Sequence, residues 1–150
     1  MTAHLQTEYA PQKLVIDTNI ALDILVFNEP KVAQLKADLA AGRVQWLATP
    51  VMRDELERVL AYAQIAPRVA FYGLDAAAVL AAFDAQVQLC AIAPKVAVDC
   101  KDADDQKFLD LAAHEKAWLL SKDRQVLKCR KRLQKWGGQI SAVYPGLALA

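Results

Sequence analysis

The sequence lacks the features that mark disulfide-rich, zinc-binding and membrane-spanning proteins. Its three cysteines, Cys90, Cys100 and Cys129, are odd in number and no two lie close together, which supports neither a disulfide framework nor a zinc site. No apolar run approaches the roughly 20 residues of a membrane-spanning helix, and residues 1–12 are polar, without a signal-peptide pattern. We therefore expect a cytoplasmic protein with reduced thiols and no membrane partner.

The chain also lacks an interdomain linker, an internal repeat and any low-complexity segment beyond its richness in alanine. Its 150 residues are the usual length of one domain, and the 55% of hydrophobic residues are ample for a core. We expect a single domain over residues 1–150, with 1–12 as a loose leader and 145–150 as a tail. The two histidines, His4 and His114, are expected on the surface rather than as ligands.

The stretch that organises the chain is an apolar run, Leu14-Val15-Ile16, that stops at Asp17. A short run that is apolar on both faces is typical of the centre of a parallel sheet. Ionised aspartate is almost never fully buried unless it is paired or binds a metal. Asp17 lies between a buried strand and the helix that follows, so we do not expect it to be a packing residue.

Strands and helices are predicted to alternate along the whole chain. Further strands are expected at residues 44–48, 96–98, 117–121 and 139–143. Helices are expected at residues 20–27, 30–41, 50–60, 76–90, 108–116 and 124–136, with one short helix within 63–73. This alternation predicts an α/β fold, a three-layer sandwich with a central, mainly parallel sheet of four or five strands.

Acidic residues follow each of the first four predicted strands; in chain order they are Asp17, Glu55, the cluster at residues 99–105, and Asp123. In open parallel sheets, ligands bind at the carboxyl ends of the strands. We therefore expect these carboxylates to lie along one edge of the sheet, around a common cleft.

Each of these acids also has a purely structural interpretation. Asp17 and Asp123 could cap the helices that follow them. Asp102 lies three residues before Asp105, which is nearly a capping box with Asp102 as the N-cap. Glu55 could lie on a solvated helix face, although helical spacing places it beside the apolar stripe of its helix. Capping and a role in a cleft are compatible, because an acid in the first turn can still face a cleft.

Several carboxylates in one cleft repel one another, so that some would stay protonated at neutral pH. A Mg²⁺ or Mn²⁺ ion, which prefers carboxylate and water ligands, removes that repulsion and can support phosphodiester hydrolysis. Between residues 122 and 135 there are seven basic side chains and one acid, which suits contact with a phosphate backbone. The alternative is that both charged stretches are solvated helix faces.

Four motifs in this order resemble the PIN domain, a family of metal-dependent ribonucleases. They are Val15-Ile16-Asp17-Thr18-Asn19, the stretch from Thr49-Pro50 to Leu60 with Glu55, the stretch from Cys100 to Leu109, and Leu119-Leu120-Ser121-Lys122-Asp123. The likeness runs from Leu14 to about Pro145. Within the family, the chain is most similar to the toxin components of bacterial toxin–antitoxin systems.

The resemblance implies a set of site residues and partners. Asp17, Glu55, Asp105 and Asp123 would form an acidic quartet around Mg²⁺ or Mn²⁺, with Asp102 as a further candidate ligand. Asn19 and Ser121 would orient carboxylates through hydrogen bonds. RNA would contact the basic side chains, of which the candidates are Lys122, Arg124, Lys128 and Arg130. The family also implies a homodimer, and the toxin branch implies an antitoxin that blocks the site.

The leading hypothesis is therefore a metal-dependent endoribonuclease that is the toxin of a toxin–antitoxin pair. The alternative is a catalytically inactive PIN-like module that binds RNA or protein. A phosphatase with an aspartyl nucleophile would need a second aspartate where this chain has Asn19. A structure-specific DNA nuclease of related fold would need a longer chain.

Overall fold

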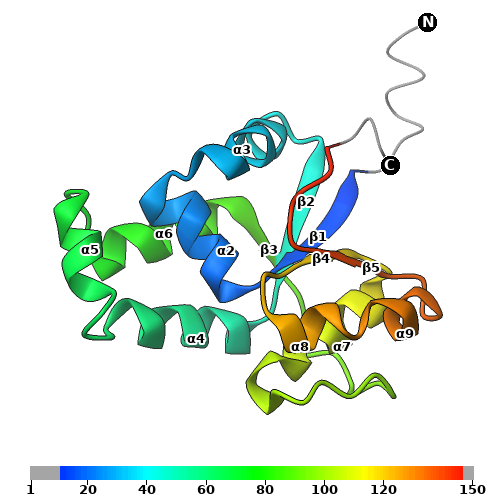
Figure 1. The fold of residues 1–150 in the computed structure, drawn as a ribbon. Helices are drawn as coiled ribbons and strands as arrows, with labels where there is room; N and C mark the ends of the chain where they lie inside the picture. Colours follow the sequence, from blue (N-terminus) through cyan, green and yellow to red (C-terminus); the bar gives the residue numbers. More distant parts are fainter. Residues whose placement is uncertain (1–10, 147–150) are drawn as a thin grey trace, which may run out of the picture.

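The computed structural model describes residues 11–146, so the predicted leader and tail lie largely outside it. Its centre is a five-stranded sheet in the order β3-β2-β1-β4-β5 with every neighbouring pair parallel (Figure 1). The strands are β1 (Gln12–Ile16), β2 (Val44–Ala48), β3 (Val87–Leu89), β4 (Trp118–Leu120) and β5 (Gln139–Ser141). The predicted α/β fold with a parallel sheet of four or five strands is confirmed.

Helices cover both faces of the sheet (Figure 1). One face is covered by α2 (Thr18–Leu22), α3 (Ala33–Ala40) and α6 (Ala76–Gln86). Helix α4 (Pro50–Leu60), which leads into α5 (Ala66–Phe71), packs against α2 and α6 and sends Met52 to the opposite face. The other face carries α7 (Gln106–Glu115), α8 (Arg124–Leu127) and α9 (Arg130–Gln134). A π-helical turn, Asp23–Phe27, continues α2, and 3-10 turns at Pro30–Val32 and Ala103–Asp105 precede α3 and α7. No helix among residues 11–146 is long and apolar enough to cross a membrane.

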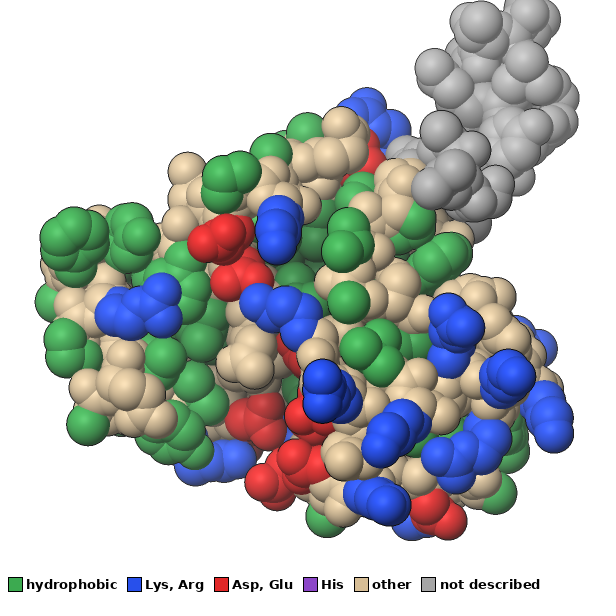
Figure 2. Space-filling model, viewed as in Figure 1, with side chains coloured by type: hydrophobic (Ala, Val, Ile, Leu, Met, Phe, Trp, Pro, Cys, Tyr) green, Lys and Arg blue, Asp and Glu red, His purple; other side chains and the backbone are tan. Residues whose placement is uncertain are grey.

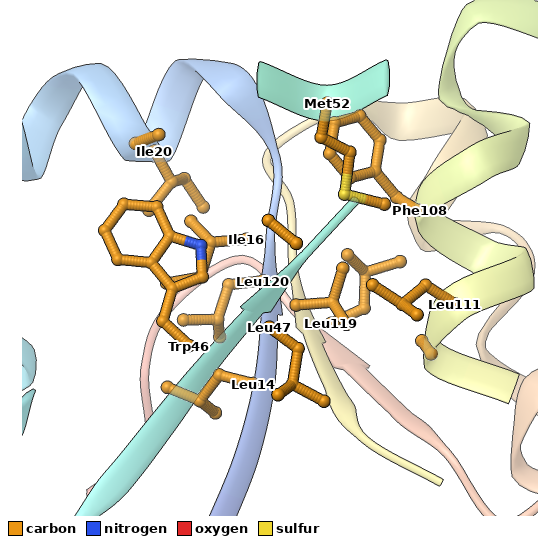
Figure 3. Close-up of a cluster of buried hydrophobic side chains, with 14 of the residues drawn as sticks. Leu14, Ile16, Ile20, Trp46, Leu47, Met52, Phe108, Leu111, Leu119 and Leu120 are labelled. Atoms are coloured by element: carbon orange, nitrogen blue, oxygen red, sulfur yellow. The ribbon is translucent and has the colours of Figure 1, made fainter. Parts of the chain in front are cut away.

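The core is built from the alternation of side chains along β1, β2 and β4 (Figure 3). Leu14, Ile16, Trp46 and Leu120 point to the face that Ile20 of α2 covers. The opposite face carries another cluster, formed by Leu47, Leu119, Met52, Phe108 and Leu111. All these side chains are buried, so β1 and its neighbours are apolar on both faces, as parallel central strands require.

The direction in which the chain adds successive strands to the sheet reverses at β1. The chain moves outward from β1 through β2 to β3, then returns to β4 on the other side of β1. Such a reversal leaves a crevice at the carboxyl ends of the two strands, where ligands of open α/β sheets bind. In this chain the crevice lies where β1 meets Asp17 and where β4 meets Ser121.

The third strand was predicted wrongly at residues 96–98. The strand is Val87–Leu89, which pairs with β2, and Cys90 extends the pairing by donating its N–H to the Ala48 carbonyl at 2.7 Å. Within residues 96–100, three backbone groups bond to side chains of α7 instead. The Val96 N–H donates to Asp110, and the Gln106 amide bonds the Val98 carbonyl and the Cys100 N–H.

Several helix bounds also differ from the prediction. The basic helix expected at 124–136 is two short helices, because the chain turns at Lys128 and Cys129 between α8 and α9. The helix expected at 76–90 ends at Gln86, where the chain enters β3. The helix at 50–60 is confirmed, with the Thr49 hydroxyl as its N-cap acceptor.

Candidate functional site

A cleft of about 130 Å³ lies at the carboxyl ends of β1 and β4. Its lining consists of Asp17, Thr18, Asn19, Glu55, Val59, Asp105 and Asp123. The structure therefore brings together all four acids of the predicted quartet. They come from segments far apart in the sequence, which is what a functional site at the reversal of a parallel sheet requires.

Asp17 and Asp123 are joined through the hydroxyl of Ser121. Ser121 Oγ donates to Asp17 Oδ2 at 2.6 Å and accepts the N–H of Asp123 at 3.1 Å. Asp17 is only 5% exposed and Ser121 is fully buried. The predicted orienting position of Ser121 is thus present in the geometry, and the hydroxyl fixes the rotamer of Asp17.

Both of these aspartates also cap helices, as their structural interpretation required. Asp17 Oδ1 accepts the N–H of Ile20 at 3.0 Å at the start of α2. Asp123 Oδ1 accepts the N–H of Gln125 at 2.7 Å at the start of α8. Capping occupies one oxygen of each carboxylate. The two roles therefore coexist at these positions.

Glu55 reaches the cleft from the second turn of α4 and has a cationic partner. The ammonium of Lys107 donates to Glu55 Oε1 at 2.6 Å, and the hydroxyl of Thr18 donates to Oε2. The exposed fraction is 20% for the Lys107 side chain and 16% for that of Glu55. Sequence reasoning missed both partners. In the sequence, the only indication of these partners is that Thr18 directly follows Asp17 and that Lys107 lies two residues after Asp105.

Three aspartates converge closely enough to share a cation. Asp102, Asp105 and Asp123 each offer a carboxylate oxygen, and these oxygens lie within 4.8 Å of one another. Asp102 also accepts the N–H of Asp104 at 3.0 Å, capping the 3-10 turn that leads into α7. Asp102 is exposed and Asp105 is half-buried. Asp102 therefore combines its predicted capping role with a place among the candidate ligands.

The crowding of carboxylates perturbs their protonation. Burial, together with the negative charges of Asp102 and Asp123 and smaller contributions from Asp17 and Glu55, raises the pKa of Asp105 to about 7. Burial also raises the pKa of Asp17, although the Ser121 hydroxyl opposes it by stabilising the carboxylate. Hard oxygen donors in this number fit Mg²⁺ or Mn²⁺, whose charge would relieve the repulsion.

The remaining predicted residues lie around this cleft with different partners. Asn19 lines the cleft and is exposed, so its orienting role stays a prediction. Lys122 donates to Asp23 at 2.8 Å, beside the cleft. Arg124 and Lys128 line a shallow hollow, and Lys128 and Arg130 line a second one, of about 480 Å³, between α8, α9 and β5. Figure 2 shows Lys and Arg side chains gathered over α8 and α9, next to the acids.

Comparisons with known proteins agree with this architecture. A chain in the crystal structure of VapBC2 from Rickettsia felis bound to a DNA fragment from their promoter superposes with a TM-score of 0.56 at 13% sequence identity. The match covers 87% of this chain and 98% of that one, which is a likeness of fold. No curated protein matches the sequence. The sequence profile of the PIN domain matches residues 13–125, three quarters of the length. The chain therefore belongs to the PIN domain family.

Proposed function

We propose that this protein is a Mg²⁺- or Mn²⁺-dependent endoribonuclease that hydrolyses phosphodiester bonds of RNA. The observation that carries the proposal is the meeting of Asp17, Glu55, Asp105 and Asp123 in one cleft, where burial and the neighbouring carboxylates raise the pKa of Asp105 to about 7. Membership of the PIN domain family supports the same chemistry.

The residues suited to hold the metal are Asp102, Asp105 and Asp123, whose oxygens converge, with Asp17 beside them in the cleft. A bound divalent ion supplies an activated water and stabilises negative charge on a phosphoryl oxygen. Ser121 keeps Asp17 pointed at the cleft and holds the backbone of Asp123 at the same time. Burial of Asp17 and Ser121 excludes bulk water from behind the carboxylates, which strengthens their electrostatic interaction with a cation.

The RNA backbone would bind along the basic surface that begins at the cleft. Asp123 directly precedes α8, so Arg124 and Lys128 extend from the site itself, and Arg130 continues the surface on α9. Lys122 lies on the opposite flank, where it pairs with Asp23. Neutralising several phosphates at once releases counterions and provides affinity without base specificity.

We also propose that the protein acts as the toxin of a toxin–antitoxin pair, with an antitoxin that covers the cleft, and that it forms a homodimer. The support for the toxin role is the resemblance of the four sequence motifs to that branch and the similarity in fold to a chain of the VapBC2 complex. The homodimer is what the family resemblance implies. An inactive module that binds RNA or protein is the alternative function. It would keep the fold and the basic surface but would not cleave.

The decisive experiment is cleavage of a mixed RNA pool in Mn²⁺, in Mg²⁺ and in EDTA. Wild type should cut only with metal, and Asp17→Asn should lose at least about 100-fold in rate, because a charged group at the reacting centre is removed. Asp17→Asn should melt no lower than wild type, since burial penalises the charged form of Asp17. Asp84→Asn is the matched control, because Asp84 pairs with Arg53 outside the cleft.

The outcomes separate the two candidate functions. Metal-dependent cleavage that is lost in Asp17→Asn supports the nuclease. RNA binding without cleavage by a folded, metal-bound wild type supports the inactive module. Sequencing the cut ends would then define the substrate.

A further inference from the structure

Lys107 is the unexpected member of the acidic cleft. It lies in the first turn of α7, and its ammonium approaches Glu55 Oε1 at 2.6 Å while also donating to the carbonyl oxygen of Asp104. The ammonium lies 4.9 Å from the centre of the Phe108 ring, and Phe108 is buried. The side chain is therefore held by three neighbours rather than extended into solvent.

The charge balance of the cleft depends on this residue. The carboxylates of Asp17, Glu55, Asp105 and Asp123 line the cleft, and Asp102 adjoins it. Within residues 11–146, Lys107 is the only Lys or Arg that forms an ion pair with any of these five; Lys122 pairs with Asp23 instead. An ion pair that is mostly shielded from solvent is screened less by salt than a surface pair.

Both carboxylate oxygens of Glu55 have a hydrogen-bond partner. One of its oxygens accepts from Lys107 and the other from the Thr18 hydroxyl. Glu55 is accordingly absent from the group of carboxylates whose oxygens converge within 4.8 Å, which contains Asp102, Asp105 and Asp123. A divalent ion that approached Glu55 would therefore compete with the ammonium of Lys107 for the negative charge of that carboxylate.

We infer that Lys107 is a positioning residue that serves as a built-in cation: it holds Glu55 in the metal-free protein and competes with the divalent ion for that carboxylate. The inference rests on the proposed metal site but concerns a residue outside the acidic quartet. Lys107 partly neutralises the cleft when no metal is bound. It also weakens metal binding, because the ammonium repels a divalent ion in the cleft and competes with it for the negative charge of Glu55.

Titration calorimetry with Mn²⁺ alone, on the full chain and without RNA, tests the inference. Lys107→Met keeps most of the side-chain length but removes the charge, and should lower the dissociation constant roughly three- to tenfold, the size expected for one charge near a divalent ion at a partly exposed site. Lys107→Arg keeps the charge and should match wild type. Lys13→Met is the control, because Lys13 pairs with Glu115 outside the cleft. Unchanged or weaker binding by Lys107→Met overturns the inference.

Two further measurements show whether the effect passes through Glu55. In a Glu55→Gln background, the tightening caused by Lys107→Met should shrink to less than about twofold, because the contested carboxylate is gone. A tightening of undiminished size would overturn the competition. In EDTA, Lys107→Met should melt below wild type, and saturating Mn²⁺ should close that gap; equal melting in EDTA would contradict the role as a built-in cation.

Failure of this inference is distinguishable from failure of the proposed function. If wild type binds Mn²⁺ but cuts no RNA, the nuclease proposal fails and the calorimetric comparison still decides the role of Lys107. Binding of Mn²⁺ by Lys107→Met alone supports the inference in its strongest form. Binding by neither protein overturns both.

Discussion

The two sides of the cleft are held in place by different forces. One side, here the hydrogen-bonded side, consists of Asp17, Ser121 and Asp123, which are connected by hydrogen bonds at 2.6 and 3.1 Å. The other, the charged side, contains Glu55 and Lys107, which form an ion pair at 2.6 Å. It also contains Asp102 and Asp105, whose carboxylates repel each other. The first follows from the sheet, whereas the second depends on a balance of charge.

Backbone register explains why the hydrogen-bonded side is rigid. Ile16 lies opposite Leu120 in the β1–β4 pair, and the Asp17 N–H extends the pairing by donating to the Leu120 carbonyl at 3.0 Å. The next residue along each strand therefore falls at the same place, and Ser121 meets Asp17 directly. On the charged side, Glu55 and Lys107 come from α4 and α7, and no strand pairing fixes their separation. Side-chain truncation should therefore damage the hydrogen-bonded side most, whereas pH and metal should act mainly on the charged side.

The largest effect is expected from truncating the hydrogen-bonded side. Ser121→Ala removes the acceptor of the half-buried Asp123 N–H and the buried donor to Asp17. This should cost about 1–3 kcal/mol of unfolding free energy and about 10- to 100-fold in cleavage rate, the usual cost of losing a group that orients a metal ligand.

Thr18→Val is the matched change on the charged side. It removes the hydroxyl that donates to Glu55, but Glu55 keeps Lys107. Thr18 is only half-buried, and the expected loss is below about 1 kcal/mol. Urea unfolding and cleavage rates of both variants make the comparison. If Thr18→Val costs as much as Ser121→Ala, the difference between the two sides does not exist.

A pH dependence should come from the charged side. In the metal-free protein Asp105 keeps its proton up to about pH 7, whereas in the unfolded chain it loses it near the ordinary pKa of 3.8. Between these values the folded state binds more protons, so its stability falls as pH rises, and the penalty is complete above pH 7. Asp105→Asn does not titrate. In EDTA it should therefore melt progressively above wild type as pH increases from about 5 to 8.

Two controls separate this effect from general changes in charge. Asp104→Asn alters an exposed neighbour outside the cleft lining and should follow wild type at every pH. Adding Mn²⁺ at high pH should stabilise wild type more than Asp105→Asn, because the ion relieves the repulsion that Asp105 experiences. A constant melting difference across the whole pH range would show that Asp105 does not titrate between these limits.

The two sides also differ in how well the sequence predicted them. Asp17 and Ser121 follow short apolar runs that must be buried strands, so their meeting at one edge follows from parallel pairing. Asp102 and Asp105 were expected to follow a third strand at residues 96–98, but β3 ends at Leu89. The acids arrive instead through a long connection. Its Val98 is buried, and its backbone is bonded by Gln106 and Asp110 of α7.

Local pattern could not have decided that choice. Val87–Leu89 and residues 96–98 are both short stretches with apolar residues at alternate positions, and what selects the first is a free edge of β2 within reach of α6. The Lys107–Glu55 pair was missed for a similar reason, since its members lie on α4 and α7 and no strand pairing fixes their separation. The interruption between α8 and α9 coincides with a tertiary contact: Cys129 is buried there, with its Sγ 3.7 Å from the carbonyl oxygen of Asp99.

The smallest expected effect concerns RNA affinity, and it should again separate the two sides. Only the hydrogen-bonded side continues into basic helices, because Asp123 caps α8. Lys128→Ala and Arg130→Ala should each weaken binding of single-stranded RNA in EDTA about two- to fourfold and reduce the slope of log affinity against log salt by roughly 1. Lys101→Ala removes an exposed positive charge beside Asp102 on the charged side and should change neither quantity. An equal loss of affinity with Lys101→Ala would mean that RNA binding depends only on net charge. Unchanged affinity of Lys128→Ala and Arg130→Ala would mean that RNA does not bind along α8 and α9.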